Sequence, residues 1–275
     1  MRSRYLGLAA ALLIVLPLSG HAEVDRVSDK ELTTLVKDLD RKAGKFISAV
    51  DSKLKNSIVR GATGEKDFGL FLGDFDKSIE RLQKRYSKTY AASEEASDVI
   101  RRGSELDAFV KSQPGMKGEK QWVTLSADLT RVALAYGADY PADPTRIVPA
   151  RRVGDGELLA AIDVIAKSSA TAAKAAAKIS KDKKATDAAR ASATAFVHSS
   201  ELAKPSLEAL KRRVSKGESS LAEAKQVVAA MTDMTSAASN LAFAEKTAQA
   251  WEKAGPAAGK LALAYGIEPA DKPLE

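Results

Sequence analysis

The chain of 275 residues contains no cysteine and only two histidines. The absence of cysteine excludes disulfide bonds, thiolate zinc sites, iron–sulfur ligation and cysteine nucleophiles. Aromatic residues make up only 5% of the chain, whereas hydrophobic residues of all kinds make up 45% and charged residues 29%. This composition is typical of a soluble, foldable chain, neither disordered nor collagen-like. Chemistry that depends on thiols is therefore excluded, and chemistry that depends on imidazole has few residues to use.

The first 22 residues predict a secretory signal peptide that is cleaved. Arg2 and Arg4 supply a positive start, an apolar stretch follows over residues 6–18, and small residues at positions 20 and 22 form a cleavage site. The apolar stretch is too short for a helix that spans a hydrocarbon core of ~30 Å, which favours a signal peptide over an uncleaved anchor. We therefore expect an exported, soluble chain, periplasmic or secreted, with no transmembrane segment after cleavage.

Cleavage changes the charge balance. The complete chain carries 43 basic and 36 acidic residues, a net charge of +7, and loss of Arg2 and Arg4 leaves a net charge of +5. It also removes His21, so that His198 is the one histidine of the expected mature chain. A mild positive charge assists contact with anionic surfaces without requiring it.

Self-similarity at a spacing of about 128 residues predicts two tandem copies of one unit. The paired segments are 28–32 with 154–158, 77–88 with 205–216, Trp122 with Trp251, 132–137 with 261–266, and 141–143 with 269–271. Chance similarity between helical segments rich in Ala, Lys and Glu is the alternative, and the shared order of the segments argues against it. The sequence thus predicts a first copy over residues 23–147 and a second, Ala-rich copy over residues 148–275.

Apolar residues recur every three or four positions in four segments of the first copy, which predicts four helices. These segments fall within residues 32–54, 68–86, 99–109 and 122–136. Ser28 with Glu31 predicts a capping box at the start of the first helix, and the glycines at 61 and 64 predict a break, with no strand. We therefore expect an all-α chain of two tandem, internally duplicated antiparallel helical bundles, each of about four helices.

The second copy keeps this plan with smaller side chains. Residues 158–179 carry an apolar stripe whose middle is serine and alanine, which lets helices approach closely but buries less apolar area. Pro205 predicts an interruption of the second helix, at or near a helix start. Ser220 with Glu223 predicts a capping box that opens a long helix through Leu241.

His198 and Glu201 form the strongest pattern for chemistry, because a spacing of three residues places both on one helix face. That spacing occurs in metal sites of helical bundles, which need further ligands from neighbouring helices. No second histidine remains after cleavage, so we expect a surface histidine, with no metal and no cofactor. Ser-x-x-Lys sequences and paired acids lie in highly charged segments, typical of exposed faces. The sequence therefore predicts that the protein is not an enzyme.

Two sets of residues recur at equivalent places in the two copies and are weak candidates for ligand or partner contacts. An aromatic set either lines a pocket or belongs to the core: Trp122, Tyr136, Trp251 and Tyr265. A basic set either contacts an anion or complements the dipole at a helix C-terminus: Lys84, Arg85, Arg212 and Arg213.

These patterns favour a non-enzymatic protein of a bacterial-type cell envelope that binds a macromolecular partner, either a protein or an envelope component. The alternative is a protein that binds a small apolar ligand within a bundle, and a third hypothesis is an enzyme or metal site that depends on His198. Nucleic acid is not expected as a partner, because the charge is mild and few aromatic residues are present to stack on bases. The sequence does not indicate the partner's identity or the oligomeric state.

Overall fold

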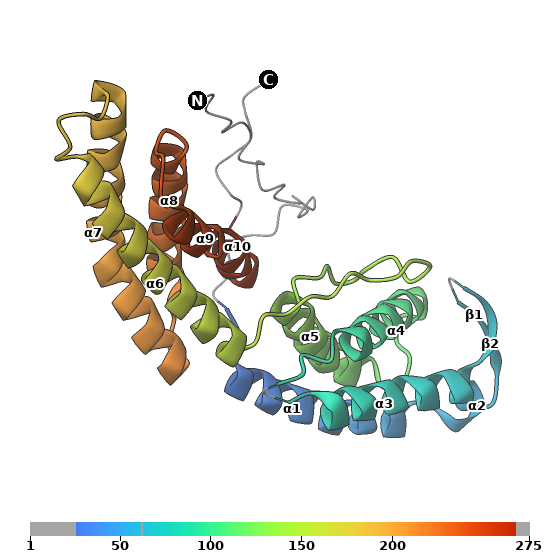
Figure 1. Ribbon diagram of the computed structural model, residues 1–275. Coiled ribbons are helices and arrows are strands. Elements are labelled where there is room, and N and C mark those ends of the chain that lie inside the picture. The colour runs from blue at the N-terminus through green and yellow to red at the C-terminus, as the bar shows by residue number, and fades with distance from the viewer. Residues whose placement is uncertain (1–25, 62, 88, 268–275) are drawn as a thin grey trace. The chain divides into compact units, whose positions relative to one another are not determined.

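The computed structural model describes residues 26–61, 63–87 and 89–267 of the chain (Figure 1). The structure is 72% helix and 4% strand, which confirms the prediction of a mostly helical chain. The predicted signal peptide lies outside the described residues.

The described residues divide into two compact units. The first unit comprises residues 26–159 and 212–221, and the second comprises residues 160–211 and 222–267. The predicted duplication, with its boundary between residues 147 and 148, stays a prediction.

Four long helices enclose the core of the first unit (Figure 1). They are α1 (Asp29–Ala49), α3 (Phe68–Arg85), α4 (Ser93–Ser112) and α5 (Glu119–Ala135). Helix α1 packs against α3 and α5, and α4 packs against the same two helices. The four apolar stripes of the sequence are therefore the faces that these helices bury. The capping box of Ser28 and Glu31 at the start of α1 is confirmed.

A β-hairpin stands where the sequence predicted a break without strands. After the short helix α2 (Ser52–Lys55), strand β1 (Ile58–Gly61) pairs antiparallel with β2 (Gly64–Asp67). The buried carboxylate of Glu105 on α4 accepts a hydrogen bond from Thr63 at 2.9 Å and pairs with Lys66 at 2.8 Å. The expectation of no strand was wrong. The contact with α4 stabilises the hairpin, and the strands show no alternation of apolar residues from which they could have been predicted.

The second unit contains helices with smaller side chains. They are α6 (Asp155–Ile179), α7 (Asp187–Lys216), α8 (Leu221–Ala238), α9 (Glu245–Glu252) and α10 (Ala254–Tyr265), of which α6 and α7 also contribute residues to the first unit. Phe196 is fully buried and contacts the rings of Phe243 and Trp251 edge-on, at 5.8 and 5.0 Å between centroids. This aromatic contact anchors a unit in which much of the buried surface is alanine.

Two expectations about the second copy require correction. Helix α7 continues through Pro205, so the predicted interruption there was wrong. Proline removes only its own backbone N–H from the helix, and the neighbouring turns are held by burial of Ala203 and Leu207. Helix α8 begins directly after Ser220, as predicted, but it ends at Ala238, before the expected Leu241.

The starts of α1 and α6 bind each other through reciprocal hydrogen bonds inside the first unit. The backbone N–H of Asp29 donates to Oδ2 of Asp155, and the backbone N–H of Asp155 donates to Oδ2 of Asp29, each at 2.9 Å. Each carboxylate thus lies at the N-terminus of the other helix, where N–H groups lack partners within the helix and the helix dipole favours negative charge.

Two arginines complete this arrangement in the same crossed fashion. Arg152 donates from Nη2 to Oδ1 of Asp29 at 2.8 Å, and Arg26 forms an ion pair with Asp155. Each arginine also donates to the backbone carbonyl two residues before its carboxylate partner, at 2.7 Å from Arg152 and 2.8 Å from Arg26. The arginine side chains are only 2% and 8% exposed, respectively. We call these four charged residues the reciprocal clamp.

The pKa of the Asp29 carboxyl lies below its ordinary value. Burial alone would raise this pKa, but hydrogen bonds from Arg152, from the Asp155 backbone and from the Tyr86 hydroxyl together favour the charged form and outweigh burial. Burial raises the pKa of Tyr86 to about 12, so its hydroxyl stays protonated and donates. A lowered pKa stabilises the fold above the unfolded value of about 3.9, and this contribution is lost as the pH falls through the folded pKa.

Replacement of Asp29 by asparagine (Asp29→Asn) is expected to reduce the free energy of unfolding by about 3 kcal/mol at pH 7, because it leaves the buried guanidinium of Arg152 without its carboxylate. The deficit should shrink as the pH falls below ~4, because Asp29 is then protonated first in the unfolded chain and, at still lower pH, in the folded protein. Urea unfolding, followed by circular dichroism at intervals of ~1 pH unit between pH 3 and 7, measures both effects. Asp38→Asn, in an exposed pair with Arg41, is the control and should cost less than about 1 kcal/mol. Equal losses for the two variants would contradict the role of the clamp.

Candidate functional site

The structure places His198 and Glu201 together on α7, and both side chains are exposed. No acidic or histidine side chain from another element joins them: within the part of the chain that the structure describes, no group of three or more such residues is arranged to hold a metal ion. The pair thus has the spacing of a metal site without the converging ligands that such a site uses.

The aromatic candidates of the first unit lie in its core. Trp122 is 3% exposed, and its indole contacts the ring of Phe46 at 5.0 Å between centroids. The indole N–H donates to Oδ1 of the buried Asp107 at 3.1 Å. Tyr136 is fully buried, and its hydroxyl donates to the carbonyl oxygen of Ala91 at 2.6 Å. Both polar groups are therefore used to hold the bundle together.

The equivalent aromatic residues of the second unit differ in exposure. Trp251 on α9 is half-buried beside Phe196, whereas Tyr265 at the end of α10 is 2% exposed. Trp122 and Tyr136 thus belong to the core of the first unit, whereas Trp251 and Tyr265 belong to the second unit.

The basic candidates lie at the ends of helices. Lys84 and Arg85 occupy the last turn of α3, where cations complement the helix dipole. Lys84 pairs with Glu80 at 3.5 Å. Arg85 pairs with Glu95 at 2.9 Å and its guanidinium lies 5.1 Å from the ring centroid of Tyr90. Acidic and aromatic neighbours thus already engage both side chains.

Arg212 and Arg213 lie near the C-terminus of α7, also in the first unit. Arg212 is exposed, whereas Arg213 is half-buried and donates to the carbonyl oxygen of Ser219 at 2.9 Å. This bond joins the end of α7 to the turn before α8, so Arg213 has a structural contact where the sequence suggested an anion-contacting surface.

A cavity of about 390 Å³ opens between α4 and α5 beside Trp122. Val110, Pro114 and Val123 supply apolar walls, but the lining also contains charged residues, namely Asp107, Lys111 and Glu119. The carboxylate of Asp107 lies 2.6 Å from Nζ of Lys111. This cavity has a charged wall and is a poor match for a purely apolar ligand.

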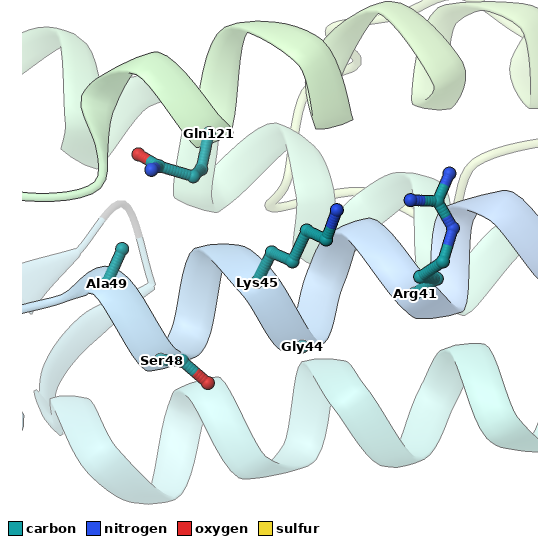
Figure 2. A pocket seen from close by; sticks show the side chains of 6 residues that line it. All are labelled: Arg41, Gly44, Lys45, Ser48, Ala49 and Gln121. Atoms are coloured by element: carbon teal, nitrogen blue, oxygen red, sulfur yellow. The ribbon is translucent and has the colours of Figure 1, made fainter.

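A larger, open groove of about 600 Å³ lies over α1, with Gln121 of α5 at its side. Figure 2 shows the side chains of Arg41 and Lys45 on successive turns of α1, with Gln121 on the neighbouring α5 and its amide pointing toward the Ala49 end of α1. Gly44 directly precedes Lys45 and has no side chain, and no atom lies within 4 Å of the position a Cβ would take. Ser48 supplies a hydroxyl one turn further along. The groove is thus basic and polar.

The groove belongs to a longer row of cations on the outer face of α1. Exposed basic residues follow one another at spacings of seven, four and four positions, opposite the buried stripe of the same helix: Lys30, Lys37, Arg41 and Lys45. We call these four residues the basic face. They span about 22 Å along the helix axis.

The cations of this face are largely without acidic partners. Among the described residues, no carboxylate lies within ion-pair distance of Lys30, Lys37 or Lys45, and Arg41 has a single exposed partner, Asp38, at 3.0 Å. Lys42, one position away on the side toward α5, instead pairs with the buried Asp128 at 2.6 Å. The structure thus separates a cation used for packing from cations that face solvent.

The basic face was not predicted from the sequence, because its cations are not adjacent in the chain. The signal was present as periodicity: the cations recur at helical spacing on the side of α1 opposite its apolar residues. The groove itself had no signal, because Gln121 enters it from a helix far away in the sequence.

No helix within the described ranges is both long and apolar enough to cross a membrane. No protein-family model matches this chain, and comparison with curated proteins and with solved structures likewise found no match.

Proposed function

We propose that this chain is a non-enzymatic binding protein, and that the basic face of α1 holds an extended, acidic segment of a partner protein. The observation that carries the proposal is the row of exposed cations on α1, three of which have no acidic partner among the described residues. Clustered like charges repel one another and are costly to keep together without a compensating anion. A partner's carboxylates would supply that compensation.

The spacing of the cations favours an extended segment. Lys37, Arg41 and Lys45 are four residues apart, which places neighbouring cations about 6 Å apart along the helix axis. In an extended chain, side chains on one face repeat about every 6.8 Å. Alternate acidic residues of an extended peptide can therefore meet successive cations of the helix, with the guanidinium of Arg41 offering the bidentate geometry that carboxylates accept.

The neutral residues of the groove suit the backbone of such a segment. Gly44 lines the groove without a side chain, so a main chain can approach the helix surface closely there. Gln121 and Ser48 lie at the groove with amide and hydroxyl groups that both donate and accept hydrogen bonds. The cations would thus attract the acidic segment, and these neutral groups would position its backbone.

The alternative of a small apolar ligand has less support. The cavity beside Trp122 is the described feature that comes nearest to it, and Asp107, Lys111 and Glu119 line that cavity together with its apolar walls.

We also propose that the protein acts outside the cytoplasm, in the periplasm or after secretion, once residues 1–22 have been removed. The positive start, the short apolar stretch and the small residues before Glu23 support this proposal. The paired segments of the sequence support two tandem antiparallel bundles as the products of a duplication.

Intact mass spectrometry of the protein expressed from its complete sequence in a bacterial host tests the export proposal. The mature protein recovered from the periplasm or medium should begin at Glu23, with the expected mass of residues 23–275. A cytoplasmic product that retains residues 1–22 would contradict it.

The triple variant Lys37→Gln, Arg41→Gln, Lys45→Gln tests the basic face. A fluorescent deca-glutamate peptide serves as the acidic probe, at low ionic strength. Each cation contributes about 1 kcal/mol to an exposed charge contact, and 1.4 kcal/mol is tenfold in affinity, so loss of three cations should raise the Kd about 100-fold. Fluorescence anisotropy measures the Kd, and added salt should weaken binding to the native protein.

A matched control removes the same number of charges elsewhere. Lys204, Lys246 and Lys253 are exposed and lie in the second unit, outside the basic face. Their replacement by glutamine should change the Kd by less than about threefold, because they do not belong to the basic face and exposed charges outside the binding site are screened by salt. A similar loss of affinity in both triple variants would reduce the effect to net charge and contradict the proposal.

A further inference from the structure

The reciprocal clamp fixes how α1 and α6 correspond. Residues 26–32 read Arg-Val-Ser-Asp-Lys-Glu-Leu, and residues 152–158 read Arg-Val-Gly-Asp-Gly-Glu-Leu. In the structure, the arginine and aspartate of each segment make the same contacts to the other segment. Equivalent positions of the two helices are therefore 126 residues apart, a register set by contacts as well as by sequence similarity.

Burial follows the same register. Seven apolar residues of α1 and its C-cap are buried: Leu32, Leu35, Val36, Leu39, Ala43, Phe46 and Val50. At the equivalent positions of α6, all seven residues are buried as well: Leu158, Ala161, Ile162, Ile165, Ser169, Ala172 and Ala176. The inner faces of the two helices thus correspond, and so must the outer faces, because the helical repeat is the same.

The outer face of α6 carries three exposed lysines, and the positions equivalent to Lys37 and Lys45 hold Asp163 and Thr171. Lys167 stands at the position equivalent to Arg41, and Lys174 at the position equivalent to Ser48, with Lys178 one turn further along; all three lysines are exposed. No carboxylate of the described residues lies within ion-pair distance of them, whereas the acid on the same face, Asp163, is paired with Lys211 at 2.5 Å. Ala170 replaces Gly44, which keeps the centre of the face small.

We propose that this outer face of α6 is a second binding site for an extended acidic peptide segment, so that one chain holds two such segments. The proposal rests on the proposed function of the basic face and extends it to a second helix. Lys167 and Lys174 are about 10.5 Å apart along the helix axis, and Lys174 and Lys178 about 6 Å apart. With three cations at wider spacing, the α6 site binds more weakly than the α1 site.

Isothermal titration calorimetry with the unlabelled deca-glutamate peptide tests the proposal at low ionic strength on the mature chain. The native protein should bind two peptides per chain with different affinities. The variant Lys167→Gln, Lys174→Gln, Lys178→Gln should bind one peptide, with the affinity of the stronger site. The triple variant of the α1 face should retain the weaker event, and the combined variant should bind none. Circular dichroism at 222 nm checks that each variant keeps the native helix content.

The possible failures are distinguishable. One peptide per chain, with binding unchanged by the α6 substitutions, would overturn the second site and leave the α1 site standing. No binding to the native protein would overturn both. The protein could instead fail to bind the peptide at α6 but sediment with vesicles that contain phosphatidylglycerol. If substitution of the α6 lysines abolished that sedimentation, the face would bind a membrane surface, which would overturn the proposal. Loss of the second event in the Lys204, Lys246, Lys253 control would also overturn it.

Discussion

The mutual capping of two helix starts is the interaction on which the first unit depends. Asp29 and Asp155 each accept a hydrogen bond from the backbone N–H of the other, so each carboxylate lies at a helix N-terminus that is not its own. Arg26 and Arg152 neutralise the two carboxylates in the same crossed order. Buried charges are tolerated only when they are paired, and here each arginine is paired with the aspartate of the other segment. This arrangement thereby fixes where α1 begins, and with it which residues of α1 face the core.

That orientation determines which charged residues of α1 pack against the unit and which face solvent. Leucine, valine and phenylalanine occupy the inner face, Lys42 lies at the margin in a short ion pair with the buried Asp128, and the basic face is left toward solvent. A helix rotated by one residue would bury a cation and expose a leucine. The same contacts act at the start of α6, and the two helices share their buried apolar positions.

The sequence was sufficient for the helices but not for the features that join them. Helical spacing of apolar residues predicted the four long helices of the first unit, and Ser28 with Glu31 predicted where α1 begins. The hairpin was missed because its stability depends on Glu105, a residue from α4 with no pattern of its own. The interruption at Pro205 was predicted from the preference of proline for helix starts, whereas the burial of its neighbours keeps α7 continuous. Of the clamp, only the Asp-x-Glu-Leu part was recognised. The preceding Arg-Val pair was visible in both segments, but its role requires knowledge that the segments meet. The groove over α1 depends in the same way on a residue from α5.

Footprinting of lysines by an amine-reactive reagent tests whether an acidic segment lies along the basic face of α1. Lys37, Lys45, Lys204 and Lys246 are all exposed, so all four should react in the protein alone. With saturating deca-glutamate, Lys37 and Lys45 should lose reactivity while Lys204 and Lys246 keep theirs. Unchanged reactivity of Lys37 and Lys45 in the presence of bound peptide would contradict the proposal.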